Sequence, residues 1–314
     1  MKHFLSTRAI RRDDAIALLD TTMDMAELRR SDTKGNELLA GKTVANVFFE
    51  DSTRTRLSFE IAARALGADI VTFTAAGSSA SKGESLKDTL QTLEAMGSNH
   101  IVLRHGDSGV AETVVEQGWV SSHLINAGDG THEHPTQALL DAYTIRTRIN
   151  GTNNRGGDLS SARVVIVGDV LHSRVARSNL WLLRTLGASV SVAAPITLQP
   201  AELLADAGVT TYSTLDDALD AEPNVVMCLR VQRERMSGGF FPTETEYARF
   251  WGMSESRLER LSSDAIVMHP GPMNRGVEIA SSVADSAQSV VTEQVTNGVA
   301  ARMAVLSHLT GGGK

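Results

Sequence analysis

Residues 43–73 read TVANVFFEDSTRTRLSFEIAARALGADIVTF, and this stretch decides the fold. The β-branched and aromatic residues of 43–49 predict a strand, and the apolar spacing over 54–66 predicts a helix that ends at Gly67. Residues 69–73 predict a second strand. A strand, a helix and a strand in this order form a βαβ unit, in which the two strands are parallel.

The same alternation continues in both directions along the chain. Further helices are predicted at 13–30, 84–96, 110–117, 136–149, 174–186 and from 288 onward, and further strands at 101–103, 123–126, 163–167, 189–193, 225–229 and 265–268. We therefore expect an α/β fold of two doubly wound parallel-sheet domains bridged by long helices. The predicted domains are 1–135 together with 288–314, and 136–287.

The composition leaves room for two globular domains. The chain has 314 residues, of which 42% are hydrophobic, and its 30 Lys and Arg against 37 Asp and Glu give a net charge of -7. This excludes a disordered chain, and the acidic balance is unsuited to binding nucleic acid nonspecifically. No apolar run is long enough for a membrane span, the N-terminal residues lack a secretory signal, and Cys228 is the only cysteine. We expect a cytoplasmic protein with no membrane or nucleic-acid partner.

The first candidate site is the segment Ser52–Thr55, between a predicted strand and a predicted helix. Hydroxyls and free backbone N–H groups at a helix start can hold a phosphate, although Ser52 and Thr53 could also simply cap the helix. Arg54 and Arg56 favour the anion site, because cations at a helix N-terminus are disfavoured unless an anion is bound there.

Other polar residues follow further strands of the first half. Arg104 ends one predicted strand, and His134 and Gln137 follow another. Because ligands bind at the carboxyl edge of such a sheet, these residues are expected to converge on the Ser52 loop. The loop around Ser78 and Lys82 could supply a mobile cation, or be only a solvated loop.

His132 and His134 stand at alternate positions, so they could belong to a metal site or serve in ligand binding. Asp129 and Glu133 lie nearby, but no third strong ligand is evident, so we expect no metal.

In the second half, GDVLHSR follows a strand and opens a helix, as a dinucleotide site would. It lacks the second and third glycines of that fingerprint, which argues against a nicotinamide-dependent dehydrogenase. Arg174 remains at the helix start, and Arg230 and Gln232 follow the next strand. We assign no chemistry to Cys228, which is expected to be a small buried apolar group.

Seven motifs occur in one order across nearly the whole chain: FxExSTRTR, SKGES, LRH, HPTQ, GDxxxSR, RVQxER and HPGPxNRG. Together they resemble the catalytic chains of the aspartate carbamoyltransferase family, within the aspartate/ornithine carbamoyltransferase superfamily. The ornithine enzymes typically carry Cys-Leu-Pro in the last loop, whereas His269 is followed here by Pro270, Gly271 and Pro272. Two arginines, Arg174 and Arg230, also suit the two carboxylates of aspartate better than the cation of ornithine.

The resemblance implies a role for each matching position. The phosphate of carbamoyl phosphate would be bound by Ser52, Thr53, Arg54, Thr55 and Arg104, and Ser78 would also belong to the carbamoyl-phosphate site. The carbonyl oxygen would be contacted by Thr55, Arg104 and His134, and the amide by Gln137 with backbone carbonyls of Gly271 and Pro272. Aspartate would be held by Lys82, Arg174, Arg230 and Gln232. The implied catalytic set is Arg54, Thr55, Lys82, Arg104 and His134.

The resemblance also implies an assembly and a mechanism. The loop of Ser78 and Lys82 would come from the neighbouring subunit of a homotrimer, and Glu50 would pair with Arg174 and Arg235 on domain closure. The amine of L-aspartate would attack carbamoyl phosphate directly, giving N-carbamoyl-L-aspartate for pyrimidine synthesis, with no cofactor. Three readings stay open: whether regulatory chains or dihydroorotase join the trimer, whether another amine such as ornithine is the acceptor, and whether the chain is a noncatalytic scaffold.

Overall fold

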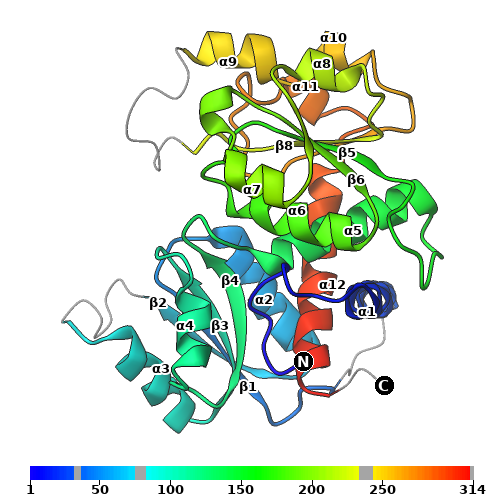
Figure 1. Ribbon diagram of the computed structural model, residues 1–314. Helices are drawn as coiled ribbons and strands as arrows, with labels where there is room; N and C mark the ends of the chain where they lie inside the picture. Colours follow the sequence, from blue (N-terminus) through cyan, green and yellow to red (C-terminus); the bar gives the residue numbers. More distant parts are fainter. Residues whose placement is uncertain (32–36, 75–82, 233–242, 312–314) are drawn as a thin grey trace. The chain divides into compact units, whose positions relative to one another are not determined.

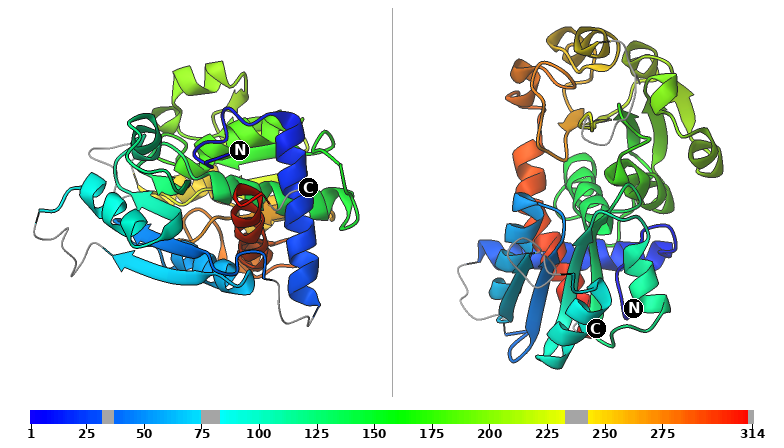
Figure 2. Two further views of the ribbon diagram at one scale, coloured as in Figure 1. Left: turned by 90° about the horizontal axis from the view of Figure 1, so that it is seen from below. Right: turned by 90° about the vertical axis from the view of Figure 1, so that its left-hand side faces the viewer.

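The computed structural model describes residues 1–31, 37–74, 83–232 and 243–311. Its internal contacts divide the chain into two units. Unit 1 comprises Met1–Ala9, Ala17–Leu140 and Thr296–Lys314, and unit 2 comprises Ile10–Ile16 and Asp141–Val295. Three helices contribute residues to both units: α1 (Arg12–Arg30), α5 (Pro135–Asn150) and α12 (Val291–Leu309). α1 and α12 are the long helices drawn in blue and in red (Figures 1 and 2).

Unit 1 is built on a parallel sheet of four strands in the order β2-β1-β3-β4 (Figure 1). Its strands are β1 (Thr43–Phe48), β2 (Asp69–Thr74), β3 (Ser98–His105) and β4 (His123–Asp129), and its helices are α2 (Thr53–Ala65), α3 (Leu86–Ala95) and α4 (Val110–Glu116). Inward residues of β1 and β3 pack against α3 and α4 in one apolar cluster. His100 of β3 faces the other side, where it contacts Thr310 beyond the end of α12. Helices therefore cover both faces, as a doubly wound sheet requires.

The N-terminal residues extend this sheet, which the sequence did not predict. Phe4 forms a parallel bridge with Ile125 of β4, and its backbone exchanges hydrogen bonds with Leu124 and Asn126, each at 2.9 Å. Of this segment only Phe4 and Thr7 are fully buried. With so few inward apolar residues, the segment has no strand pattern that periodicity could detect.

Unit 2 is built on a parallel sheet of five strands in the order β7-β6-β5-β8-β9. Its strands are β5 (Arg163–Val167), β6 (Ser189–Ala193), β7 (Thr210–Tyr212), β8 (Val225–Cys228) and β9 (Ile266–Met268). Its helices are α6 (Arg174–Thr185), the 3₁₀ turn η2 (Ile196–Leu198), α7 (Ala201–Asp206), α8 (Leu215–Leu219), α9 (Glu244–Trp251), α10 (Glu255–Leu258) and α11 (Ser281–Ala284). One face packs against α8 and α11, and Figure 1 shows α5 and α6 on the other.

The expected fold class, two doubly wound α/β domains with parallel sheets, is confirmed. Cys228 is fully buried and free, and burial raises the pKa of its thiol, which suits an inert apolar group. No helix in the described residues is both long and apolar enough to cross a membrane.

Candidate active site

The predicted site residues of unit 1 gather at the carboxyl edge of its sheet. β1, β3 and β4 are adjacent and parallel, with Phe48 paired to Arg104 and His105 paired to Asp129. The loops that leave these strands therefore start side by side. In an open α/β sheet this is the edge at which ligands bind.

Ser52 begins α2 as its N-cap. Its backbone is extended, with φ of -161°, and its hydroxyl accepts a hydrogen bond from the backbone N–H of Thr55 at 3.4 Å. Thr55 is buried, whereas Thr53 and Arg54 are exposed. The first turn contains no acidic residue. It thus offers backbone N–H groups, hydroxyls and a guanidinium to an anion, with no carboxylate in that turn to oppose it.

Arg104 is the buried cation of this edge, with 8% of its surface exposed. Its Nη2 donates to Oε1 of Glu50 at 2.6 Å, and its Nη1 donates to the carbonyl of Ala127 at 3.2 Å. These two bonds tie the ends of β1, β3 and β4 together through one planar side chain. A guanidinium held in this way is fixed before any ligand arrives.

His134 and Gln137 lie where the chain passes from β4 into α5. Both are buried, with 5% and 8% exposure, and the backbone N–H of Gln137 donates to the carbonyl of His134 at 3.0 Å. His132 is bound to a carboxylate instead: its Nδ1 donates to Oδ2 of Asp129 at 3.0 Å. That hydrogen bond raises the pKa of His132 against the opposing effect of burial. Among the residues the structure describes, no three metal-ligating side chains are grouped.

The candidate residues of unit 2 likewise follow strands that are neighbours. Arg174 opens α6 behind the N-cap Ser173 and is 5% exposed. Arg230 and Gln232 lie in the segment that leaves β8, which pairs with β5. Both half-buried, they stand at the same sheet edge as the turn that leads from β5 into α6.

Asp169 and His172 join this group although the sequence analysis did not select them. Asp169 is fully buried, and its Oδ1 accepts from the backbone N–H of His172 at 3.1 Å and lies 2.9 Å from that residue's Nδ1. Its Oδ2 accepts from the backbone N–H of Gln232 at 3.3 Å. One carboxylate therefore holds together the two segments that carry Arg174 and Gln232. An acidic residue two positions after a buried strand was the available signal.

The loop after β9 contains Gly271 and Pro272, and the buried side chain of His269 holds its backbone. Nδ1 of His269 accepts from the backbone N–H of Gly271 at 2.8 Å, so the ring hydrogen lies on Nε2, which donates to Glu278 at 3.1 Å. The backbone N–H of His269 donates to Gln294 at 3.0 Å. The peptide bond between Gly271 and Pro272 is cis.

Three selected residues, Ser78, Lys82 and Arg235, lie outside the described residues. Glu50, expected to pair with Arg174 and Arg235, contacts Arg104 within unit 1.

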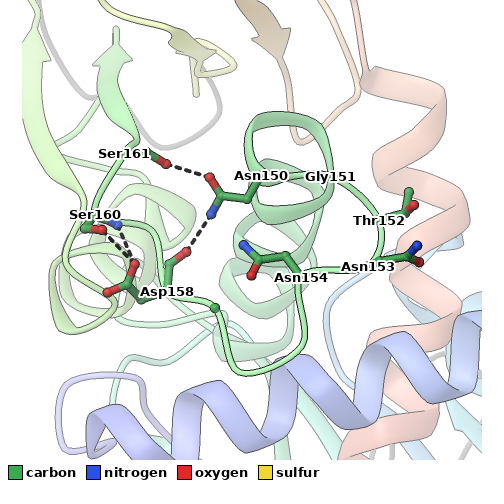
Figure 3. Close-up of a pocket in the computed structure, with 9 residues that line it drawn as sticks. Asn150, Gly151, Thr152, Asn153, Asn154, Asp158, Ser160 and Ser161 are labelled. Atoms are coloured by element: carbon green, nitrogen blue, oxygen red, sulfur yellow. Dashed lines mark hydrogen bonds between the residues drawn. The ribbon is translucent and has the colours of Figure 1, made fainter.

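A separate cavity of about 820 Å³ lies in unit 2 at the opposite end of β5 (Figure 3). It is lined by Asn150, Gly151, Thr152, Asn153, Asn154, Gly157, Asp158, Ser160 and Ser161. Its one carboxylate, Asp158, is already bonded to Ser160 and Arg12. None of the selected site residues lines it.

Comparison with known proteins gives this arrangement a family. Residues 2–147 match the model of the aspartate/ornithine carbamoyltransferase carbamoyl-phosphate binding domain, and residues 160–309 match that of the Asp/Orn binding domain. The chain is 58% identical over 312 residues to the aspartate carbamoyltransferase catalytic subunit of Leifsonia xyli subsp. xyli, covering 99% of both chains.

Solved structures agree in fold and in family. Aspartate transcarbamoylase from Trypanosoma cruzi, in complex with carbamoyl phosphate, is 31% identical with a TM-score of 0.85, covering 98% of this chain and 95% of that one. The catalytic subunit of M. jannaschii aspartate transcarbamoylase is 35% identical with a TM-score of 0.82, covering 98% of each chain. Matched by both domain models and by relatives along its full length, the chain belongs to the aspartate/ornithine carbamoyltransferase family.

Proposed function

We propose that this chain transfers the carbamoyl group of carbamoyl phosphate to the amine of L-aspartate, giving N-carbamoyl-L-aspartate and phosphate for pyrimidine synthesis. One observation carries the proposal: each sheet presents a buried arginine at its carboxyl edge, Arg104 in unit 1 and Arg174 in unit 2. Such cations suit two small anionic substrates, and the chain's relatives are aspartate carbamoyltransferase catalytic subunits.

The carbamoyl-phosphate site is assigned to the carboxyl edge of unit 1. Its phosphate is bound by the first turn of α2, with Ser52, Thr53, Arg54 and Thr55, and by Arg104. The carbonyl oxygen is contacted by Thr55, Arg104 and His134, and the amide by Gln137 and the backbone of Gly271 and Pro272. The fixed guanidinium of Arg104 supports this assignment, because it needs no reorganisation when charge develops on the oxygen.

The aspartate site is assigned to Arg174, Arg230 and Gln232. The support for this assignment is the buried Asp169. Its carboxylate accepts hydrogen bonds from the backbone of His172 and of Gln232, and so fixes the segments that carry Arg174 and Gln232. Residues 1–135 with 288–314 would be the carbamoyl-phosphate domain, and 136–287 the aspartate domain. Ser78 and Lys82 complete the site from a neighbouring subunit, and Glu50 and Arg235 serve domain closure.

The chemistry needs positioned donors rather than a protein nucleophile. The amine nitrogen of aspartate forms a bond to the carbamoyl carbon, an oxyanion develops on the carbonyl oxygen, and the bond to phosphate then breaks. The amine proton leaves with the departing phosphate. Each donor aimed at the oxyanion contributes about 3 kcal/mol of barrier lowering, and holding the two reactants together supplies much of the rest.

The assembly assigned to the chain is a homotrimer with shared active sites, in the cytoplasm. Its support is a pair of apolar side chains one turn apart on α2, Leu57 and Ile61, which are each more than 40% exposed. Exposed apolar side chains that are neighbours on one helix suit contact with a second copy of the chain. Mixing inactive Lys82→Ala chains with inactive Arg54→Ala chains should restore activity, because one hybrid interface is fully wild type. Reassembled trimers without activity would refute the shared site.

A substrate panel tests the reaction itself. Purified protein with carbamoyl phosphate should produce the carbamoyl derivative of L-aspartate and not that of L-ornithine. Phosphonoacetyl-L-aspartate, which joins the two substrates in one molecule, should raise the unfolding temperature and abolish turnover. Stabilisation by the ornithine counterpart instead would reassign the acceptor.

A further inference from the structure

We propose that Asp129 is a positioning residue for the carbamoyl group, which fixes the loop that presents His134 and Gln137 without itself touching substrate. The proposal rests on the proposed function, and it concerns a side chain that the site assignment leaves unused. Asp129 ends β4 and is 1% exposed.

The carboxylate of Asp129 accepts four hydrogen bonds. Oδ1 accepts from Nδ2 of Asn126 at 2.8 Å and from the backbone N–H of Glu133 at 3.0 Å. Oδ2 accepts from the backbone N–H of Gly109 at 2.7 Å and from Nδ1 of His132 at 3.0 Å. Each oxygen thus has two donors, which is a full complement for a buried carboxylate.

The backbone of Asp129 continues the connection toward His134. Its N–H donates to the carbonyl of Glu133 at 3.1 Å, while its side chain holds the N–H of the same residue. Both backbone polar groups of Glu133, the residue directly before His134, are therefore bonded to Asp129. Gln137 is connected to the same loop, because its backbone N–H donates to the carbonyl of His134. The position of both carbamoyl-contacting residues is set from this one carboxylate.

The neighbouring loop, after β3, holds the other side of the Asp129 loop. Gly130 donates to the carbonyl of His105 at 3.0 Å, and a Cβ on Gly130 would lie 2.7 Å from the backbone nitrogen of Ser108. Gly130 also has φ of 46°, a left-handed conformation that favours glycine. The two loops are in close contact, so the Asp129 loop cannot shift in that direction without a collision.

The side chain of Glu133 is engaged elsewhere. Its Oε1 accepts from Ser6 at 2.6 Å, and its Oε2 accepts from the backbone and hydroxyl of Thr7 at 3.2 and 3.0 Å. Glu133 is thus held through its side chain by the N-terminal segment and through its backbone by Asp129. His134 directly follows Glu133, the residue that both sets of hydrogen bonds hold in place.

Arg104 is anchored independently of Asp129, through Glu50 and the carbonyl of Ala127. A change at Asp129 should therefore disturb the ligands of the carbamoyl group and leave those of the phosphate in place. This separation gives the proposal a readout that a purely structural role would not change.

The test is Asp129→Asn, with Asp107→Asn as the matched control. Asp107 lies on the adjacent loop with a side chain that is 84% exposed. In Asp129→Asn an amide nitrogen replaces an oxygen that accepts from two donors, whichever way the amide is turned. We expect kcat to fall about 10- to 100-fold, as for other ångström-scale misplacements of reacting groups. Calorimetry should give a Kd for carbamoyl phosphate weakened about tenfold and a Kd for inorganic phosphate changed less than about twofold. Asp107→Asn should behave as wild type.

Two results would overturn the inference: Asp129→Asn with wild-type kcat and a lowered unfolding temperature only, or equal weakening of phosphate and carbamoyl phosphate. If Asp129→Asn does not fold, His132→Ala removes one of the four donors and should show the same split at about two- to fivefold. Failure of the proposed function is separate, because it would appear as a wild-type protein that makes no N-carbamoyl-L-aspartate.

Discussion

Lowering the pH from about 7.5 to about 4.5 should destabilise unit 1 through one buried imidazole, His100. The ring is 1% exposed and stacks on His123 at 4.9 Å. The hydroxyl of Thr310 donates to the carbonyl of Leu306, so it accepts from Nε2–H of His100 at 3.0 Å. The hydrogen therefore lies on Nε2, and Nδ1 is buried with no hydrogen-bond partner among the described residues. A proton added there would find no acceptor.

Burial, with smaller contributions from His123 and Lys42, lowers the pKa of His100 from its usual 6.5 to about 4. The unfolded chain binds this proton at higher pH than the folded chain, so stability is complete above pH 6.5 and is lost as the pH falls toward 4. Between the two pH values given above, the linkage amounts to about 2.5 kcal/mol of unfolding free energy.

His100→Gln isolates this effect, because the amide can still donate to Thr310 but cannot gain a proton. Denaturant unfolding of wild type and variant at both pH values should show the variant losing about 2.5 kcal/mol less on acidification. His132→Gln is the control with opposite sign, because Asp129 raises the pKa of His132 and its proton stabilises the folded state at low pH. Parallel pH dependences for wild type and His100→Gln, or a His100 resonance that titrates near 6.5, would refute the reasoning.

Three further substitutions have expected outcomes. Arg54→Ala should abolish formation of N-carbamoyl-L-aspartate while the sedimentation coefficient stays that of wild type, because the proposed site assigns Arg54 to the substrate phosphate; near-normal turnover would contradict this. Arg257→Ala should cost about 2–3 kcal/mol of unfolding free energy, since the buried guanidinium donates to three backbone carbonyls as well as to the half-exposed Asp216; a loss below about 1 kcal/mol would show those carbonyls to be hydrated. Gly168→Ala should lower the unfolding temperature, because Gly168 has φ of 114° and a Cβ there would meet the hydroxyl of Tyr247, and Tyr247→Phe should recover only the steric part; no recovery at all would leave backbone strain as the whole cause.

The order of strands and helices could be predicted because most elements have a recognisable pattern in their own residues. The strand from Thr43 and the helix ended by Gly67 follow from apolar spacing and one glycine. β7, Thr210–Tyr212, was missed because its three residues are exposed or half-buried and show no alternation. Such a short outer strand depends on its pairing with β6, which no local pattern records.

The candidate site was predictable where chemistry sits on strand ends, and not where it depends on distant backbone. Arg104 and His134 could be selected because parallel strands bring their ends to one edge. Asp129 and Asp169 could not be given a role from sequence, because each also binds one distant backbone N–H, that of Gly109, 20 residues away, for Asp129 and that of Gln232, 63 residues away, for Asp169. A buried carboxylate has a function only once the fold has chosen which N–H groups surround it.

The division of the chain into units has a consequence for its synthesis. Unit 1 needs the residues from Thr296 onward, which are synthesised after all of unit 2, whereas unit 2 is complete once Val295 has emerged. At about 5–20 residues per second, Ala17–Leu140 must wait about 8–34 s until α12 has been synthesised as far as Leu309. During that interval unit 2 can reach its native contacts first, against the usual order in which the N-terminal domain folds ahead. The nascent first half, still without the end of α12, is then the form most in need of a chaperone.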